Sequence, residues 1–514
     1  KGVGEGTADL PASPSGQDHV FGWDSLGDEQ AGTIQDRCVI RMRPIDGKRE
    51  VGEWIYMSPH MDLDNFGTFT DPKAELPKAL LGAQATLLGS GAVLVTGGQE
   101  TTTGGGVTTA AVFYPGSSQT TLGEIAEIPG GMNVPRAGHT ATRLIAGEDS
   151  TGAALPAKVL IVGGFGDDGN ALASAEIYDP AANSFTELTS TLTEGARYGH
   201  VAVLMNSGKV LIAGGTDGTD FLASAMIFDP VTEEFTNLTG ASSTEMQMAR
   251  TDAQGVLLPD GNVLIAGGQD EDGALKTIEI YNPVAGRFET TDEDNDLATA
   301  RWGLSLTGTL DSETVAVAAG GMASPPKKSI ELFSSTDYEW TTATATMLDD
   351  RAFHQAEMLG DGKILFAGGQ KDESGTFSAT ADVYDPVGDK MESPNGNLRV
   401  AQKNACSVVL ANGRALIFGG LTATGATDLI QVFTPDSETG FNLPPQAQIR
   451  TPTSIEPWAF GVRIYLRLTD GEQDKARIVA QYKVKSDPDD DTGSLDDEYK
   501  AKLEGIDVHR ITEE

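Results

Sequence analysis

The chain has 514 residues, of which 39% are hydrophobic and 6% aromatic, with 62 glycines, a composition that fits a turn-rich β protein better than a helical one. Its 75 acidic and 36 basic residues give a formal net charge of −39, which repels nucleic-acid phosphates and anionic membrane surfaces, so neither is expected as a partner. No stretch approaches the roughly 20 apolar residues that a membrane-spanning helix needs, and the two cysteines, Cys38 and Cys406, are too few for a disulfide framework.

The first 77 residues divide into an arm and a hairpin. Residues 1–36 are rich in Gly, Ala, Ser, Pro and Asp, which is typical of an extended arm, and we expect this arm to pack on a neighbouring subunit or across the rest of the chain. Residues 38–57 form two runs around Asp46-Gly47 and predict a β-hairpin within the segment 37–77. Either this hairpin joins a C-terminal hairpin in one sheet, or the strand around Trp54 completes the last of the repeats that follow.

The start of the chain and its cysteines bear on location. The chain begins at Lys1 rather than Met, which we interpret as removal of a leader and hence export to an extracellular, periplasmic or cell-surface location. Adaptation to salty or extracellular conditions would account for the acidity, and a specific cationic partner is the alternative. In an oxidising compartment Cys38 and Cys406 can form one long-range disulfide, and two buried free thiols are the alternative.

Residues 78–445 repeat one short pattern seven times. Each copy is an apolar strand that ends in Gly-Gly, and the first glycines of successive pairs lie 66, 51, 53, 53, 48 and 51 residues apart. A period near fifty residues indicates a repeat architecture. The copies are VLVTGG (93–98), VLIVGG (159–164), VLIAGG (210–215), VLIAGG (263–268), AVAAGG (316–321), ILFAGG (364–369) and ALIFGG (415–420).

Each glycine pair belongs to a longer unit. An alternating stretch with a tight Ser-Gly, Asp-Gly or Asn-Gly turn precedes most pairs, and a step such as IYDP (177–180) follows the pair in all units except the fifth. An aromatic residue then marks a fourth strand in most units, and Met391 takes this place in the sixth. Four short antiparallel strands per unit are therefore expected. The fourth-strand aromatics are Phe185, Phe235, Phe288, Trp340 and Phe441.

Seven four-stranded units without helical periodicity predict an all-β chain whose main domain is a seven-bladed β-propeller. The paired glycines are expected where blades crowd near the axis, since a missing side chain lets one backbone approach another. The strand ending in Gly-Gly, the Tyr-Asp-Pro-like step and the following Trp or Phe resemble the kelch repeat family. This resemblance implies a kelch-type propeller over 78–445, and it implies little about function, because such propellers serve many unrelated roles.

Five units begin their first strand with an arginine, and three of them place a histidine three residues later. Equivalent positions recur around a propeller axis, so these arginines are expected to form a partial basic ring near one channel mouth. Guanidinium groups bind carboxylates bidentately, which makes the ring a candidate site for a small anion. The alternative is that each arginine pairs with a neighbouring acidic residue and fixes the loops between blades. The candidate residues are Arg136, Arg197, Arg250, Arg301 and Arg351, with His139, His200 and His354.

The Arg-x-x-His arrangement, the seven kelch blades and a C-terminal β-module also resemble the galactose oxidase group of copper-radical enzymes. In that group copper takes two tyrosines and two histidines, and one tyrosine is joined to a cysteine. The family sequence Arg-x-Tyr-His is not matched here, since Tyr198 is displaced by one position and Phe353 lacks the hydroxyl. His509 is the only C-terminal histidine, and Cys406 has no evident tyrosine partner. No complete catalytic set is therefore predicted.

Residues 446–514 are expected to form a small β-module with an acidic tail. The segment 461–485 turns around Asp470-Gly471 and predicts a second hairpin. In the acidic stretch that follows, carboxylates alternate in a way that suits Ca²⁺, which prefers oxygen ligands, and the candidate ligands are Asp487, Asp489 and Asp491. A solvated acidic loop is the alternative, because Thr492 stands where an EF-hand loop needs glycine.

Taken together, these patterns favour a non-enzymatic exported scaffold that docks protein partners, or copies of itself, in a larger assembly. Its loops, N-terminal arm and C-terminal module would supply the contacts. A propeller that binds a carbohydrate or a small anion is the second hypothesis, and a galactose oxidase-like copper enzyme is the third. No cofactor is expected apart from Ca²⁺ at the acidic segment.

Overall fold

The computed structural model describes residues 74–435 and seven short strand segments outside that range. The described core has gaps at 116–122, 146, 149–153, 156, 239–243, 292, 310, 312, 335–336, 395 and 411–412. The chain divides into two compact units, one of residues 1–62 with 439–514 and one of residues 63–438. In the described part, no helix is long and apolar enough to cross a membrane.

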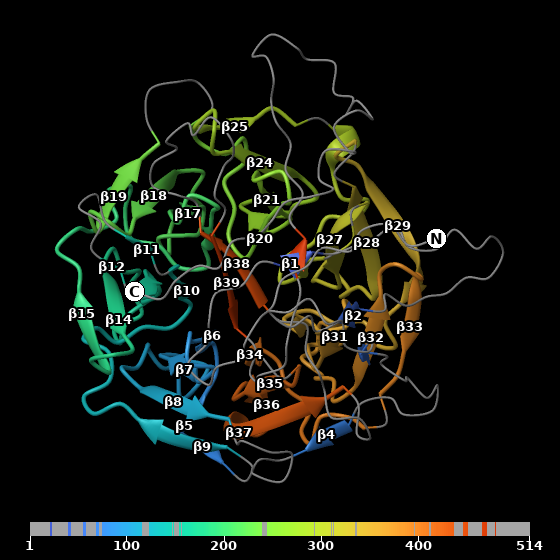
Figure 1. Ribbon diagram of the computed structural model, residues 1–514, viewed down its shortest axis with the longest axis horizontal. Coiled ribbons are helices and arrows are strands. Elements are labelled where there is room, and N and C mark those ends of the chain that lie inside the picture. Colours follow the sequence, from blue (N-terminus) through green and yellow to red (C-terminus); the bar gives the residue numbers. More distant parts are fainter. Residues whose placement is uncertain are drawn as a thin grey trace, which may run out of the picture. The chain divides into compact units, whose positions relative to one another are not determined.

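The unit of residues 63–438 is a seven-bladed β-propeller, which confirms the predicted fold (Figure 1). Each blade is an antiparallel sheet whose strands follow one another from the channel outward. Blade 1 consists of β6 (Gln84–Leu87), β7 (Val93–Thr96), β8 (Ala110–Tyr114) and β9 (Glu124–Glu127). Blade 2 consists of β10 (Thr140–Arg143), β13 (Val159–Val162), β14 (Ala175–Asp179) and β15 (Ser184–Glu187). Blade 3 consists of β16 (Val201–Leu204), β17 (Val210–Ala213), β18 (Ala225–Asp229) and β19 (Glu234–Asn237).

The remaining blades follow the same plan. Blades 4 to 6 consist of β20 (Gln254–Leu257), β21 (Val263–Ala266), β24 (Ile278–Asn282) and β25 (Arg287–Glu289); β26 (Ser305–Gly308), β27 (Thr314–Ala319), β28 (Ser329–Ser334) and β29 (Trp340–Thr346); and β30 (Gln355–Met358), β31 (Ile364–Ala367), β32 (Ala381–Asp385) and β33 (Lys390–Glu392). Blade 7 has β34 (Cys406–Val409), β35 (Ala415–Phe418) and β37 (Gly425–Thr434). Small additions are β11 (Gly147–Glu148), β12 (Ala154–Leu155), β22 (Gln269–Asp270), β23 (Gly273–Ala274), β36 (Leu421–Thr422) and a 3-10 turn at Glu293–Asn295.

The second strand of each blade forms the core. Every side chain of β17 and of β21 is buried, because a blade in a ring packs against a neighbour on both faces and needs apolar residues on each side of the strand. The first strands neighbour one another in sequence order and close the ring where β34 contacts β6. These seven first strands therefore surround the channel.

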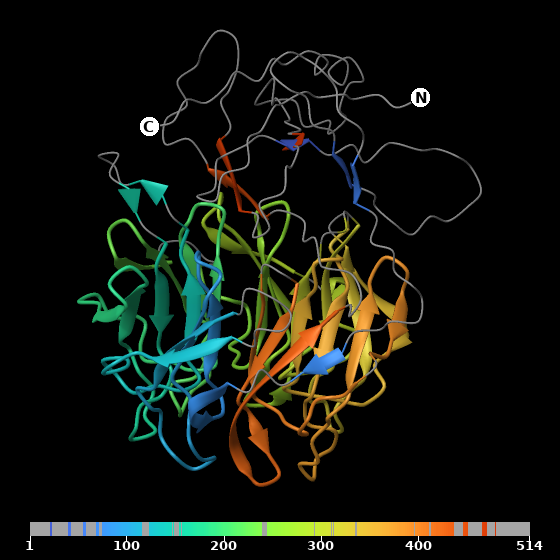
Figure 2. The same ribbon diagram turned by 60° about the horizontal axis from the view of Figure 1, so that its bottom comes forward.

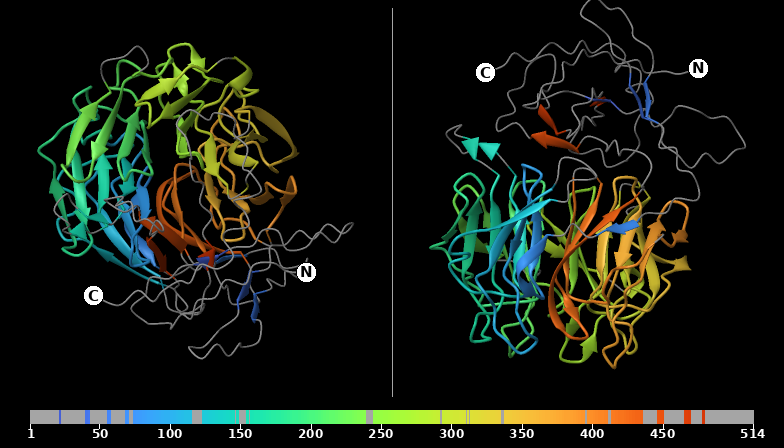
Figure 3. Two further views of the ribbon diagram at one scale, coloured as in Figure 1. Left: turned by 45° about the horizontal axis from the view of Figure 1, so that its top comes forward. Right: turned by 90° about the horizontal axis from the view of Figure 1, so that it is seen from below.

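The last blade is completed from the N-terminal side of the chain. β4 (Thr68–Thr70) pairs antiparallel with β37, and β5 (Glu75–Leu80) pairs with an earlier part of β37 (Figures 2 and 3). Phe69 lies opposite Phe433 with ring centroids 5.0 Å apart, like Phe228 and Phe235 in blade 3, also 5.0 Å apart. The fourth-strand aromatic of blade 7 is thus Phe69, and the closing strand is β4 rather than the strand around Trp54. Phe441 lies outside the described residues.

The glycine pairs have the close packing that the sequence predicts. Gly214 and Gly215 both have positive φ, 68° and 95°. A Cβ on Gly215 would lie 2.7 Å from the carbonyl oxygen of Tyr198, which is closer than any side chain tolerates. The Gly215 N–H donates a 2.8 Å hydrogen bond to the carbonyl of Arg250 in the next blade, so the pair joins neighbouring blades through the backbone.

The unit of residues 1–62 and 439–514 contains three described strand pairs. β2 (Ile40–Met42) pairs with β3 (Ile55–Met57), as the first predicted hairpin requires. β39 (Tyr465–Thr469) pairs with β38 (Gln446–Arg450), and β40 (Ile478–Val479) pairs in parallel with β1 (Phe21–Gly22). The two described strands of the segment 461–485 thus pair with other strands and not with each other, which corrects the second predicted hairpin for these residues. Apart from β1, the arm of residues 1–36 lies outside the described residues.

Candidate functional site

A belt of backbone hydrogen bonds surrounds the channel, just before the first strand of each blade. The residue two positions before each first strand has a positive φ in all seven blades. At six of the seven junctions between neighbouring blades, the N–H of this residue donates a hydrogen bond to the carbonyl of its counterpart in the preceding blade. Gly199 donates to Gly138 at 3.2 Å and Phe353 to Gly303 at 2.8 Å. We call these residues the belt and the end of the channel that they ring the mouth. The belt consists of Gly82, Gly138, Gly199, Asp252, Gly303, Phe353 and Asn404.

The five predicted arginines lie inside the blades and not on a surface. Each is at most 1% exposed. Arg136 illustrates the contacts, because its Nη1 donates to the carbonyl oxygens of Gly163 and Ser174 and its Nη2 to a carboxylate oxygen of Glu176 at 2.8 Å. Guanidinium groups with internal acceptors are not accessible to an anion in the channel, so these contacts match the alternative expectation, that each arginine fixes loops and blades.

Four arginines are paired with carboxylates on the third strand of their own blade. The pairs are Arg136–Glu176, Arg250–Glu279, Arg301–Glu331 and Arg351–Asp382, with distances of 2.6 to 3.0 Å. Burial lowers the pKa of each of these arginines, and the attraction of the carboxylate opposes that shift. The carboxylates also accept backbone N–H groups of the loop that enters the blade, such as Val134 to Glu176 at 3.0 Å.

Three blades lack this pair: blade 1 has Leu80 and Ala111 at the two positions, and two others keep a polar residue at the arginine position. In blade 3, Met226 occupies the position of the carboxylate, and Arg197 Nη2 donates instead to the carbonyl oxygen of Glu194 and to Ser224 Oγ. Burial lowers the pKa of Arg197 to about 10. In blade 7 both members are glutamines, and Gln431 Nε2 donates to Gln402 Oε1 at 3.3 Å.

The three predicted histidines are buried between inner strands. Their Nε2 atoms share hydrogen bonds with hydroxyls, His139 with Thr96, His200 with Thr140 and His354 with Ser305, at 2.9 to 3.0 Å. Burial, followed by the charge of the nearby arginine, lowers the pKa of His200 and His354 to about 3 and that of His139 well below its ordinary value. Their rings are therefore neutral and fill the space against glycine pairs of the preceding blade.

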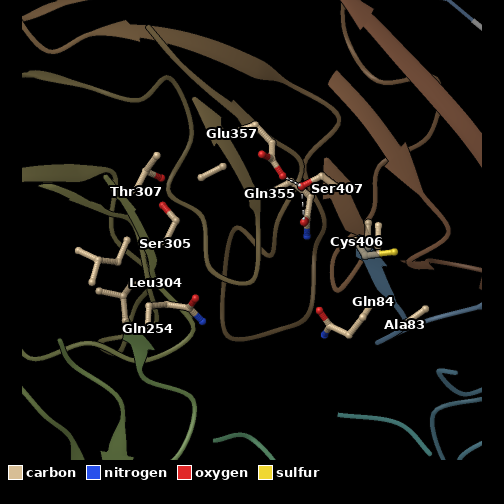
Figure 4. Close-up of a pocket in the computed structure, with 14 residues that line it drawn as sticks. Ala83, Gln84, Gln254, Leu304, Ser305, Thr307, Gln355, Glu357, Cys406 and Ser407 are labelled. Atoms are coloured by element: carbon tan, nitrogen blue, oxygen red, sulfur yellow. Dashed lines mark hydrogen bonds between the residues drawn. The ribbon is translucent and has the colours of Figure 1, made fainter. Parts of the chain in front are cut away.

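A cavity of about 300 Å³ occupies the channel. Its lining comes from the first strands of blades 1, 4, 5, 6 and 7, and its polar groups include the amides of Gln84, Gln254 and Gln355 (Figure 4). Ser407 donates to Glu357 Oε1 at 2.7 Å and lies 3.0 Å from Gln355 Oε1. Burial raises the pKa of Glu357 to about 7. We call this cavity the lumen site.

A second group of side chains gathers at the mouth. The ring centroids of Trp302 and Phe353 lie 5.1 Å apart in an edge-on arrangement. Lys403 Nζ lies 5.2 Å from the ring centroid of Phe353 and 5.6 Å from that of Phe377, within the range of cation–π attraction. All four side chains are partly exposed, and burial lowers the pKa of Lys403. We call these residues the aromatic–lysine cluster.

The features that the copper hypothesis needs are not assembled in the described residues. Cys406 is a free buried thiol whose pKa burial raises to about 12, and its sulfur donates to the Phe418 carbonyl. No group of three or more His, Cys, Asp and Glu side chains in the described part of the chain could hold a metal. Cys38, His509 and the Ca²⁺ candidates Asp487, Asp489 and Asp491 lie outside the described residues.

Sequence reasoning did not find the lumen site or the aromatic–lysine cluster, although one signal was present. Among the seven first strands, only that of blade 6, QAEM (355–358), carries an acidic residue. Aligning the strands on their glycine turns would have singled out Glu357. The cluster left no such signal, because Phe377 comes from a loop and meets Lys403 only in the folded ring.

One family model matches the chain. It describes the Attractin/LZTR1 beta-propeller, and the match covers residues 159–430, which run from the second strand of blade 2 into the last blade. A search of the curated proteins gave no match. The matched range contains all members of the aromatic–lysine cluster and six of the seven glycine pairs.

Proposed function

Because the chain belongs to the Attractin/LZTR1 beta-propeller family, we propose that it is a non-catalytic scaffold that docks protein partners at the mouth of its propeller. The aromatic–lysine cluster carries this proposal. Aromatic side chains with a cation beside them supply a large, rigid contact area and one positive charge at a fixed position, which are features of binding hot spots. The partner is expected to present a carboxylate next to an apolar side chain.

Charge supports this choice of partner. The chain carries −39 formal charges, so its general surface repels acidic segments, and a lysine held between two phenyl rings gives one place where a carboxylate is attracted. Lys403 is held in position by a 2.5 Å hydrogen bond to Gln370 Oε1. A preorganised cation binds at lower entropic cost than a free one.

A peptide selection tests the docking surface. Random twelve-residue peptides displayed on phage would be selected on the purified chain, and their affinities measured for the parent and for the Lys403→Glu and Trp302→Ala variants. We expect selected peptides to combine acidic and apolar residues and to lose at least about tenfold in affinity for both variants. Lys390→Glu on the exposed start of β33 is the charge-matched control, and peptides that bind Lys403→Glu as tightly as the parent would contradict the proposal.

Export and assembly complete the proposed function. We propose that the chain acts outside the cytoplasm within a larger assembly, to which the two terminal segments contribute contacts. The acidity of the chain and the protein-docking role of propellers support this. Light scattering on the purified chain measures the assembly directly, and a monomer near 53.9 kDa, unchanged with concentration, would rule out self-assembly.

A further inference from the structure

The lumen site places neutral hydrogen-bonding groups around one carboxyl. Gln84, Gln254 and Gln355 each stand at the first position of an inner strand, two residues after the belt. Glu357 lies two residues further along β30, so the amides lie next to the mouth and the carboxyl lies deeper. A ligand that enters through the mouth would meet the amides first and Glu357 last.

Glu357 is partly buried and lacks the cation that the fully buried carboxylates of this propeller have. The carboxylates of Glu176, Glu279, Glu331 and Asp382 each lie within 3.0 Å of an arginine nitrogen. In the described residues no ion pair involves Glu357. Its carboxylate accepts one hydrogen bond from a surrounding side chain, the hydroxyl of Ser407. A carboxylate in such a place favours a positively charged neighbour.

The elements packed around Glu357 carry no compensating charge. β26, on one side, has the sequence SLTG, and β34, on the other, has CSVV. β31, its partner in the sheet, has ILFA. Cys406 is the only other titratable side chain in the lining, and burial raises its pKa to about 12, so Glu357 alone sets the charge of the lumen site.

We propose that the lumen site binds a small polyhydroxylated primary amine, with its ammonium group at Glu357 and its hydroxyls at the amides of Gln84, Gln254 and Gln355. An ammonium group supplies the missing positive charge and donates to the carboxylate. Glutamine amides both donate and accept, as hydroxyls do, and a cavity of about 300 Å³ is at the small end of ligand sites. This inference is independent of protein docking at the aromatic–lysine cluster.

Two matched ligands separate charge from shape. Glucamine is the amine that corresponds to sorbitol, and its ammonium group stays charged up to about pH 9, near the range of lysine. Dissociation constants for both would be measured by ligand-observed NMR titration. At pH 8 we expect the parent chain to bind glucamine at least about fivefold more tightly than sorbitol, and equal affinities or no binding of either would overturn the proposal.

Variants of the lining give the second readout. Glu357→Gln should abolish the preference for glucamine, whereas Glu124→Gln on the exposed strand β9 should keep it. Gln254→Leu should weaken both ligands and leave their ratio unchanged. A Glu357→Gln variant that still prefers glucamine would contradict the assignment. If the Glu357→Gln variant binds the selected peptides as tightly as the parent chain does, the lumen site and the aromatic–lysine cluster are separate sites.

The pH dependence gives the third readout. Because the carboxyl of Glu357 has a pKa raised to about 7, its negative charge appears between about pH 6 and 8, while the charge of glucamine stays constant. Affinity for glucamine should therefore rise several-fold from pH 5.5 to pH 8.5, and affinity for sorbitol should not. A flat glucamine profile in the parent chain would contradict a role for Glu357.

Discussion

Blades 2 and 3 place a buried arginine in the same position and satisfy it differently. In both blades the guanidinium donates to a carbonyl of the glycine pair and to the serine just before the third strand. In blade 2, Glu176 completes the set and accepts the N–H groups of Asn133 and Val134. In blade 3, Met226 cannot accept, and the entering loop presents the carbonyl of Glu194 to the guanidinium instead.

This difference separates two roles of the carboxylate. The carbonyl and hydroxyl acceptors position the arginine, since they are present in both blades. The carboxylate balances the buried charge and fixes the direction of the loop peptide, which offers an N–H in blade 2 and a C=O in blade 3. Blade 7 shows that a neutral pair can fix the loop without a buried charge, because Gln431 accepts the N–H of Arg399 at 2.6 Å.

The largest effect is expected when blade 2 receives the residue of blade 3. Glu176→Met leaves Arg136 buried without a countercharge and two loop N–H groups without an acceptor, which should lower the free energy of unfolding by about 3–5 kcal/mol. Urea unfolding measures the change, and Met226→Leu, with an expected cost below about 1.5 kcal/mol, is the control. A loss under about 1 kcal/mol would mean that the loop readily adopts the blade 3 arrangement.

A double substitution tests whether blade 6 can adopt the neutral pair of blade 7. Arg351→Gln alone leaves Asp382 buried and unpaired and should cost about 3 kcal/mol, and adding Asp382→Gln should restore about 2 kcal/mol of this. The same unfolding experiment on both single variants and the double variant gives the coupling. Additive losses would show that the carbonyl contacts of the arginine matter more than its charge.

The histidine beside the arginine adds a pH dependence to the comparison. In blade 3, burial and Arg197 lower the pKa of His200 to about 3, so between about pH 6.5 and 3 the unfolded chain binds a proton that the folded chain does not. Stability conferred by the neutral ring is complete above pH 6.5 and falls by about 1.4 kcal/mol per pH unit below it. His200→Gln keeps a polar group near Thr140, and unfolding at pH 8 and pH 5 should show a smaller acid loss than in the parent; an equal loss would contradict this.

The smallest effect is expected from giving blade 3 the carboxylate it lacks. Met226→Glu places a countercharge beside Arg197, whose burial is already complete, and should raise the free energy of unfolding by about 1 kcal/mol. Met226→Gln controls for the change of shape. If the glutamate variant is less stable than the glutamine variant, the carbonyl of Glu194 already satisfies the guanidinium.

Repetition explains what the sequence could predict. Seven glycine pairs with one spacing define the blades, the buried second strands and the close backbone contacts, and each of these follows from a pattern local to the unit. The alternative reading of the arginines, as partners of neighbouring acidic residues, was also available from composition. The complete burial of the arginines could not be predicted, because the sequence around a charged residue next to a strand is the same whether its side chain faces the channel or the neighbouring sheet.

Features that combine separate segments of the chain could not be predicted either, because no pattern within one repeat shows which other segment will lie beside it. Phe69 precedes the repeats by several residues and takes the place of Phe441 only because the ring closes on itself. Tyr465–Thr469 pairs with Gln446–Arg450 although a nearer turn signal stood at Asp470-Gly471. The lumen site combines five blades, so no single repeat contains enough of it to be recognised.

The closing strand has a consequence for synthesis. β4 and its partner in β37 are separated by more than 350 residues, so the outer strand of blade 7 leaves the ribosome first and is paired last. At about 5–20 residues per second, its exposed strand edge waits on the order of 20–70 s for a partner. Thr68 and Thr70 flank one phenylalanine there, and a short polar strand is the kind least prone to pair with another chain during that wait.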